Sequence, residues 1–218
     1  MRKIIAGLAF VLMVCTGVAY AGYEEPMPDS GFLNGLGAWS FAGNAPVFTN
    51  SQTVSTGGTA GSGPTSFTTI SSPEAGNYVA IYGTAILMSP VVKVKVGDKF
   101  MSVVAFSGED YPPFNDAFTV GLISVLTGNT LASVTWSIDT IGGAYSLMPW
   151  TQFLHTFTGD DELQYFVKIE NILDRQLDSW GFSTAGTILR VPEPASLVLI
   201  AIGLFSIFVL AGRRRKQK

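Results

Sequence analysis

Residues 109–116 place several oxygen-bearing side chains on a stiff backbone. Two consecutive prolines restrict the segment, and four of its side chains carry oxygen ligands: Glu109, Asp110, Asn115 and Asp116. A hard cation such as Ca²⁺ requires such ligands, and Asp178, in a later acidic turn, is a further candidate if the two turns meet. The simpler interpretation is an Asx-type turn whose side chains bind nearby amides. We favour the turn and keep calcium as the alternative.

Four tryptophans are candidates for binding sugars: Trp39, Trp136, Trp150 and Trp180. The flat face of an indole ring accepts the apolar face of a pyranose, although large aromatic rings also fill the cores of β-proteins. The sequence does not decide which rings are exposed, so both interpretations stay open.

Other residue types that support catalysis are scarce. The single histidine, His155, lies in a candidate strand, and there is no Gly-x-Ser-x-Gly elbow for a serine nucleophile. Two carboxylates suffice for a glycosidase, which leaves three candidate acids: Glu109, Asp110 and Glu170. Acids grouped in a small β-domain belong more often to turns or cation sites, and a fold class does not imply activity. We therefore expect a chain that is not an enzyme.

Charge and cysteine content narrow the partners. Residues 22–190 contain six basic and fifteen acidic residues, a formal charge of −9. Such a surface repels phosphate backbones, so nucleic acid is not an expected partner. The only cysteine, Cys15, lies in the N-terminal apolar run, which excludes a disulfide or a cysteine-based metal site in the rest of the chain.

The residues between the two ends favour an all-β domain. Gly, Ser, Thr and Phe are frequent, and no helix-length segment interrupts them. Apolar and alternating runs predict about eight to ten strands, including residues 78–82, 92–96, 100–106, 117–126, 131–138, 150–157, 163–172 and 179–189. Turn signals at 97–98, 127–130 and 158–162 predict three tight hairpin connections. We expect an antiparallel β-sandwich over residues 31–190.

Two polar segments interrupt this pattern. Residues 22–30 carry acidic residues and prolines, which predict a flexible leader. Residues 50–72 consist mainly of Ser, Thr and Gly, with too few apolar side chains to order the segment by itself. We expect a long surface loop or an edge excursion there, with a binding loop as the functional alternative.

The N-terminus has the three parts of a secretory signal peptide. Arg2 and Lys3 precede an apolar run over residues 4–18, and Ala19 and Ala21 form a small-x-small cleavage site. We expect export through the Sec translocon and cleavage by signal peptidase after Ala21, which removes residues 1–21. The alternative is a retained membrane anchor, for which the run is short.

The C-terminus has a second apolar segment between a proline-containing motif and a basic tail. The motif, residues 191–196, begins with Val191, Pro192, Glu193 and Pro194. A transmembrane helix is expected at residues 197–212, and with the two residues before it rises about 27 Å, enough for a thin bilayer. The basic tail, residues 213–218, stays cytoplasmic by the positive-inside rule and places the body outside. An anchor that is never cut is the alternative.

This order of motif, apolar run and basic end resembles the PEP-CTERM sorting signal of Gram-negative bacteria. The resemblance covers residues 191–218 and implies processing by an exosortase-type enzyme at or near the Pro-Glu-Pro segment. It also implies transient anchoring in the inner membrane and release to the cell surface or the extracellular matrix. Proteins with this signal are associated with extracellular polysaccharide and biofilm.

The body is similar to galactose-binding-like jelly-roll domains. The similarity lies in Gly31, Phe32 and Trp39 near the start, in residues 110–116, and in residues 177–179 near the end. It implies a jelly roll in which these turns supply a structural calcium site. We expect a carbohydrate-binding or matrix-associating module of an exported protein. The alternatives are a purely structural or adhesive surface protein and a small secreted glycan hydrolase.

Overall fold

The computed structural model describes residues 22–191, except 29, 31, 33–34, 74–75 and 173–176, and also describes Gly203. The expected signal peptide and, Gly203 apart, the sorting segment from residue 192 onward lie outside the described residues. The chain divides into two units, Glu25–Ile188 and the combined ends Met1–Glu24 and Leu189–Lys218. Within the described residues, no helix has the length and apolar character needed to cross a membrane.

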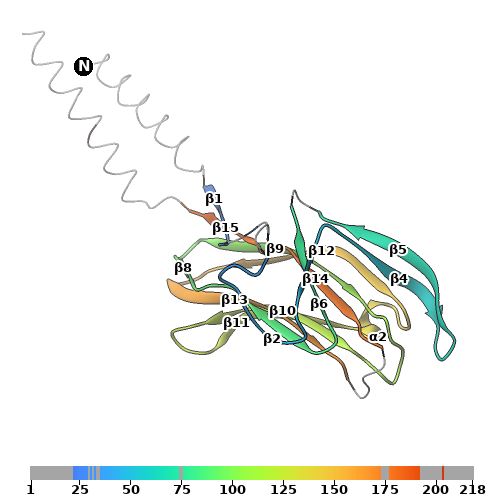
Figure 1. Ribbon diagram of the computed structural model, residues 1–218. Coiled ribbons are helices and arrows are strands. Elements are labelled where there is room, and N and C mark those ends of the chain that lie inside the picture. The colour runs from blue at the N-terminus through green and yellow to red at the C-terminus, as the bar shows by residue number, and fades with distance from the viewer. Residues whose placement is uncertain are drawn as a thin grey trace, which may run out of the picture. The chain divides into compact units, whose positions relative to one another are not determined.

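Two antiparallel sheets form a β-sandwich (Figure 1). Sheet A has the order β1 (Tyr23–Pro26), β15 (Thr187–Arg190), β9 (Lys99–Ser107), β14 (Trp180–Ser183), β6 (Tyr78–Tyr82) and β3 (Val47–Thr49), and β12 (Leu147–Thr156) also pairs with β9. Sheet B has the order β11 (Thr130–Ser137), β10 (Ala117–Ser124), β13 (Asp161–Glu170), β7 (Ala85–Met88) and β2 (Ser40–Gly43), and β8 (Val92–Val94) also pairs with β13. A separate hairpin joins β4 (Ser51–Thr59) to β5 (Gly63–Ser71), and α2 (Ile138–Ile141) is a short helix. The predicted all-β antiparallel sandwich is confirmed.

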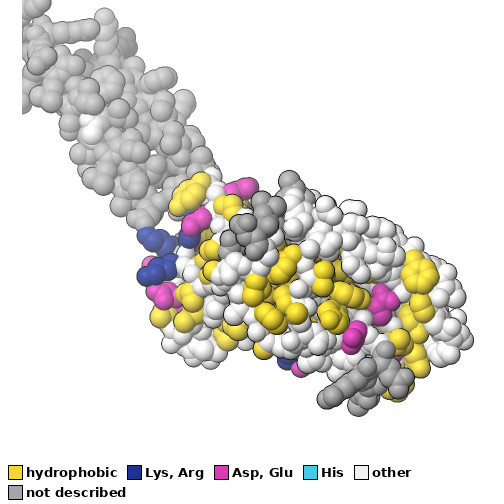
Figure 2. Space-filling model, viewed as in Figure 1, with side chains coloured by type: hydrophobic (Ala, Val, Ile, Leu, Met, Phe, Trp, Pro, Cys, Tyr) yellow, Lys and Arg dark blue, Asp and Glu magenta, His cyan; other side chains and the backbone are white. Residues whose placement is uncertain are grey.

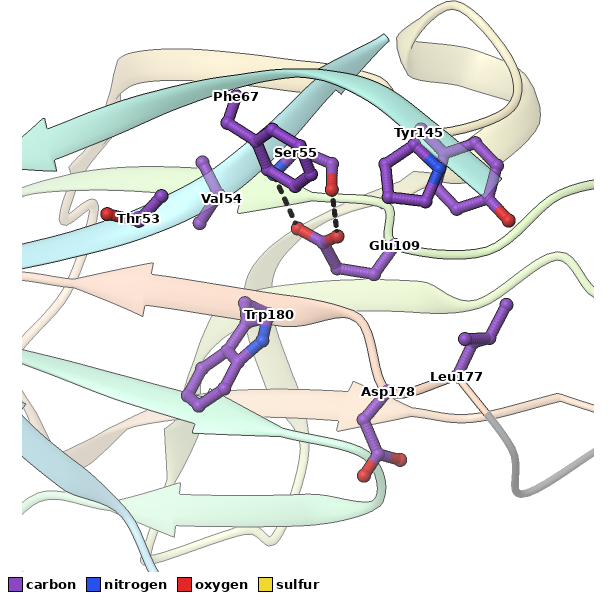
Figure 3. A pocket seen from close by; sticks show the side chains of 10 residues that line it. Thr53, Val54, Ser55, Phe67, Glu109, Tyr145, Leu177, Asp178 and Trp180 are labelled. Carbon is purple, nitrogen blue, oxygen red and sulfur yellow. Dashed lines mark hydrogen bonds between the residues drawn. The ribbon is translucent and has the colours of Figure 1, made fainter. Parts of the chain in front are cut away.

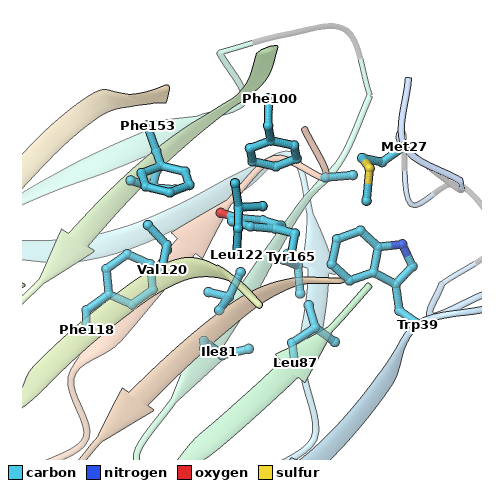
Figure 4. Close-up of a cluster of buried hydrophobic side chains, with 14 of the residues drawn as sticks. Met27, Trp39, Ile81, Leu87, Phe100, Phe118, Val120, Leu122, Phe153 and Tyr165 are labelled. Carbon is cyan, nitrogen blue, oxygen red and sulfur yellow. The ribbon is translucent and has the colours of Figure 1, made fainter. Parts of the chain in front are cut away.

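Alternation of side chains along the strands produces the core between the sheets. On β13 every second side chain is fully buried: Leu163, Tyr165, Val167 and Ile169. Figure 4 shows Tyr165 among rings from elsewhere in the chain, with Phe100 at 4.8 Å and Trp39 at 6.3 Å between ring centroids. Its hydroxyl lies 2.8 Å from Ser183 Oγ and 3.1 Å from Ser102 Oγ. Burial raises the pKa of Tyr165 to about 12.

Several tight turns cross between the sheets instead of closing hairpins. The turn at 127–130 joins the paired strands β10 and β11, which confirms that prediction. The turn at 158–162 closes no hairpin, because β12 pairs with β9 in sheet A whereas β13 pairs with β10 and β7 in sheet B. The turn at 97–98 is tight, with Asp98 N donating to Lys95 O at 3.0 Å, and it also changes sheets. Turn residues set the local chain direction, but long-range pairing decides which sheet receives the next strand.

Residues 23–28 of the segment expected to be a flexible leader lie in a strand and in defined hydrogen bonds instead. Tyr23–Pro26 forms β1, and the side chain of Met27 is only 2% exposed. Met27 N donates to Gly186 O at 3.1 Å, and Trp39 Nε1 donates to Pro28 O at 2.9 Å. The leader prediction is therefore wrong, because apolar burial and main-chain pairing hold a segment whose composition is polar.

The segment rich in Ser, Thr and Gly is a β-hairpin and not a loop. Val54 and Ile70 are buried against Tyr78 and other apolar residues of sheet A. The hydroxyl of Tyr78 donates to Ile70 O at 2.9 Å, and Trp150 Nε1 donates to Ser71 O at 2.9 Å. Threonine favours extended backbone, and docking on sheet A supplies the burial that the segment lacks by itself.

Candidate ligand-binding pocket

The outer face of sheet A carries a group of aromatic side chains. On β14, Gly181 faces the core, where an added Cβ atom would collide with the ring of Phe118. Because side chains alternate along a strand, Trp180 and Phe182 point outward. The register places Tyr82 of β6 opposite Trp180, and their ring centroids lie 4.8 Å apart at 34°. Trp180 and Tyr82 thus form an aromatic pair on this face.

The β4–β5 hairpin covers only part of the outer face. Tyr78 and Phe182 are completely buried beneath it, whereas Trp180 and Tyr82 are partly exposed. In sheet A, β14 lies between β9 and β6. Tyr82 therefore lies on the β6 side of the Trp180 ring, and Phe182, two residues along β14, stacks with that ring at 6.4 Å between centroids and 8° between planes.

A pocket of about 350 Å³ lies between the hairpin and this exposed part of sheet A (Figure 3). Hairpin residues, including the strongly exposed Phe67, form one wall. Trp180, the first residue of β14, and Leu177 and Asp178, which precede that strand, form another. Two loop residues complete the lining. The lining includes the polar or aromatic side chains of Ser55, Glu109, Tyr145, Asp178 and Trp180.

Glu109 fastens the hairpin to sheet A. Its carboxylate accepts hydrogen bonds from Ser55 N at 2.9 Å, from the Ser55 hydroxyl, and from Ser107 Oγ at 2.8 Å. Both serines are almost completely buried. The main-chain N of Glu109 also donates to Ser179 Oγ at 3.1 Å, which ties it to the residue before β14. Glu109 thus fixes the distance between two walls of the pocket, and we call this set of hydrogen bonds the Glu109 clasp.

Tyr145 is a buried lining residue with an unusual backbone. Its φ angle is +53°, and its side chain is 2% exposed. The ring lies so close to Gly58 of the hairpin that an added Cβ atom there would collide with it. Burial raises the pKa of Tyr145, and the nearby Tyr111, Asp110 and Glu109 raise it further. At neutral pH the phenol is therefore a neutral group that closes this part of the pocket.

Asp178 is an exposed carboxylate on the pocket wall. Its Oδ1 accepts a hydrogen bond from Asn171 Nδ2 at 3.3 Å. It lies over Gly83, where an added Cβ atom would be 2.7 Å from Oδ1. Gly83 has a φ angle of +63°, a conformation that L-residues rarely adopt. The position of Asp178 therefore depends on a glycine in the turn between β6 and β7.

The acids proposed as calcium ligands are spread over different contacts. Asp110 Oδ1 accepts from Tyr111 N at 2.8 Å, and Asn115 Oδ1 from Asp139 N at 3.0 Å. Asp116 accepts from two main-chain N–H groups of the acidic turn that contains Asp178, those of residues 172 and 179, at 2.9 and 3.4 Å. The two turns do meet, but through these amides. Within the described residues, no three His, Cys, Asp or Glu side chains form a group that could hold a metal ion.

The four tryptophans have four different environments. Trp39 is 3% exposed and packs against Phe32 and Tyr165, so its proposed role as a sugar platform is wrong: core packing covers its ring. Trp136 stacks on Phe118 at the sheet B side, with centroids 6.1 Å apart. Trp150 packs on Tyr78 and holds the hairpin. Of the four, only Trp180 lines the pocket.

The candidate catalytic residues are not brought together. Of the three acids considered for a glycosidase, only Glu109 lines the pocket, and the clasp engages both of its oxygens. Glu170 forms a surface ion pair with Lys168 at 2.7 Å on sheet B. His155 packs against Phe157, with centroids 5.0 Å apart, and burial lowers its pKa.

Sequence reasoning reached the hairpin side of the pocket only through the binding-loop alternative for residues 50–72, which singled out no residue as a ligand contact. Ser55, Phe67 and Tyr145 line it, yet none is a candidate from the sequence. The polar composition of residues 50–72 conceals a strand pair, and the only signals are the alternation around Val54 and the aromatic Phe67. Tyr145 carries no local signal, because its role depends on contact with the hairpin.

Solved structures with a similar arrangement include sugar-binding and adhesin domains. The chain is 11% identical to the C-terminal family 22 carbohydrate binding module of Clostridium thermocellum Xyn10B, with a TM-score of 0.41 over 79% of this chain and 94% of that one. It is 14% identical to the K3 cleaved adhesin domain of Lys-gingipain from Porphyromonas gingivalis, with a TM-score of 0.42 over 73% and 97%. It is 18% identical to the arabinose-bound MgGH51 α-L-arabinofuranosidase, with a TM-score of 0.42 over 77% of this chain, but it spans only 26% of the length of that enzyme. A search of curated proteins found no match.

The C-terminal segment matches a family model. Residues 190–216 fit the PEP-CTERM protein-sorting motif, which confirms the resemblance seen in residues 191–218. Such a motif implies processing by an exosortase and indicates an exported surface protein of the Gram-negative type. The chain thus carries a PEP-CTERM protein-sorting motif after an all-β sandwich body.

Proposed function

We propose that the sandwich is a non-enzymatic carbohydrate-binding module and that it associates the exported protein with extracellular polysaccharide. The pocket between the β4–β5 hairpin and Trp180 is the observation that carries the proposal. A pocket of about 350 Å³ is of the size that holds one or two sugar rings.

The chemistry of the pocket suits a sugar. The Trp180 ring is partly exposed and lines the pocket, and the exposed part of an indole ring can pack on the apolar face of a pyranose. The exposed carboxylate of Asp178 lines the pocket as well. Such a group accepts hydrogen bonds from sugar hydroxyls and fixes the orientation of the ring.

The pocket is also held in shape before a ligand arrives. The Glu109 clasp fixes the hairpin wall, and the buried Tyr145 packs against that wall at Gly58. A preformed site avoids the entropic cost of ordering loops on binding. This favours specific binding over a merely adhesive surface.

The ends of the chain fit a scheme of export and sorting. We propose that signal peptidase removes residues 1–21 after Sec-dependent export, and that residues 197–212 then anchor the protein transiently in the inner membrane. An exosortase-type enzyme recognises Pro192, Glu193 and Pro194 and releases the body to the cell surface or matrix. Mass spectrometry of the protein from its own cells tests this: a C-terminus near Val191 or Pro192 supports it, and an intact Lys218 in exported protein contradicts it.

A glycan array with the full-length chain tests the binding function. The chain is kept in a detergent without a sugar headgroup, so that the detergent does not compete for the pocket. We expect binding that is lost in Trp180→Ala and kept in Trp136→Ala, since Trp136 lies on sheet B. Binding to no glycan would favour the structural or adhesive alternative, and release of free sugar would favour the hydrolase.

A further inference from the structure

Two carboxylates of the pocket have only uncharged partners among the contacts of the described residues. The donors to Glu109 are the main-chain N–H and hydroxyl of Ser55 and the hydroxyl of Ser107. The donor to Asp178 is the side-chain amide of Asn171. The ion pairs seen in the described part, such as that of Lys168, lie on sheet B. These bonds stabilise the carboxylates, and among the described residues they bring no positive charge to them.

The visible surface around the β4–β5 hairpin also carries acidic side chains without described basic side chains next to them. On the face shown in Figure 2, acidic and apolar side chains lie beside β4 and β5, and no described Lys or Arg side chain is seen next to them. Among the residues that the structure describes, none that lines the pocket is Lys, Arg or His. The negative potential of the pocket is therefore not cancelled by any described neighbour.

The aromatic wall adds to this potential. The face of an indole ring is electron-rich and attracts cations, with a strength that grows as the cation is desolvated. The partly exposed Trp180 lines the same pocket as Asp178. A carboxylate and an indole face around one small volume favour a ligand that combines an apolar ring face with a positive charge.

We propose, building on the carbohydrate-binding function above, that the pocket selects amino sugars with a protonated amine over neutral and acidic sugars. Asp178 binds the ammonium group, because it is exposed and accepts only one hydrogen bond from the described side chains. Glu109 acts through its charge alone, since the clasp engages both of its oxygens. Uronic acids are repelled by both carboxylates, a form of selection by like charge.

Calorimetry with matched oligosaccharides tests the preference. The full-length chain, in the same sugar-free detergent, is titrated with glucosamine, N-acetylglucosamine and glucose oligomers of equal length and linkage, and with an oligomer of glucuronic acid. At mildly acidic pH we expect the glucosamine oligomer to bind about five- to tenfold more tightly than the acetylated one. The advantage should shrink in high salt, which screens charges, and at a pH above the pKa of the sugar amine.

A variant separates the charge from the shape of the pocket. Asp178→Asn keeps the size of the side chain and should weaken glucosamine binding about three- to fivefold, while glucose binding stays unchanged. Glu162→Gln removes one negative charge from sheet B and should change neither. If Asp178→Asn does not fold, the salt series on the unaltered chain still decides the question.

Each outcome bears on a different statement. Equal binding of the glucosamine, acetylated and glucose oligomers, or tighter binding of glucuronic acid, overturns the amino-sugar preference and leaves the carbohydrate-binding function standing. Binding of none of the oligomers, in an array that is also negative, overturns the proposed function itself.

Discussion

Removing the Glu109 clasp should free the β4–β5 hairpin without unfolding the sandwich. In Glu109→Ala, the N–H and hydroxyl of Ser55 lose their acceptors while they remain buried. Ser107 is affected less, because its hydroxyl can still donate to Ser55 O at 3.4 Å. Two lost hydrogen bonds to a charged group cost about 3 kcal/mol together. The hairpin should therefore open about 100-fold more often, since about 1.4 kcal/mol corresponds to a factor of ten.

Amide hydrogen exchange measures this opening strand by strand. Residues of β4 and β5 should exchange about 100-fold faster in Glu109→Ala, whereas the core strand β13 should keep its protection. Glu109→Gln retains one oxygen acceptor and should lie between the two. The control is Glu170→Ala, which removes a surface ion pair on sheet B and should cost at most about 1 kcal/mol. The reasoning fails if β4 and β5 exchange at the rate of the unaltered chain, or if β13 loses protection to the same extent.

Three further predictions address stability. Burial raises the pKa of Tyr78 and Tyr165 to about 12, so as the pH rises the unfolded chain loses these protons before the folded chain does. In urea titrations, the free energy of unfolding should be constant below pH about 10 and should fall between about 10 and 12, less steeply in Tyr165→Phe. A free energy of unfolding that does not change over this range contradicts the prediction. Gly83→Ala should lower the Tm more than Gly128→Ala, because both have positive φ but only the Cβ at Gly83 meets a carboxylate; equal losses would show that strain alone matters. Calcium or a chelator should leave the Tm unchanged, since main-chain amides occupy oxygens of the 109–116 turn, and a clear rise with calcium would restore the calcium site.

Local patterns in the sequence predict where strands lie better than they predict which strands pair with each other. The alternation from Leu163 to Ile169 gives β13 and its buried face directly. The turn at 158–162 misleads, because the same glycine and acidic residues serve a hairpin or a crossing between sheets. The polar segment 50–72 misleads for another reason: its burial comes from sheet A and not from its own side chains.

In the candidate site, too, the sequence predicts which residues matter better than it predicts what they contact. Trp180 and Asp178 stand out in the sequence by type alone, and both line the pocket. Glu109 also stands out, but as a cation ligand, whereas the structure uses it to hold Ser55. Ser55 lies 54 residues before Glu109 in the chain, so the role of Glu109 depends on the fold that brings the two together. The sorting motif is readable because its signal is contiguous.

The hydrogen bond from Met27 to Gly186 has a consequence for the order of events during export. In the proposed Sec-dependent export, Met27 is among the first residues of the body to be translocated, and Gly186, to whose O its N donates, is among the last. The segment around Met27 therefore lacks its hydrogen-bond partner Gly186 until nearly the whole body has crossed the membrane. Contacts of such long sequence separation form late in folding. The body can thus close only when the segment next to the sorting motif has emerged, so completion of the fold and arrival of that motif nearly coincide in time.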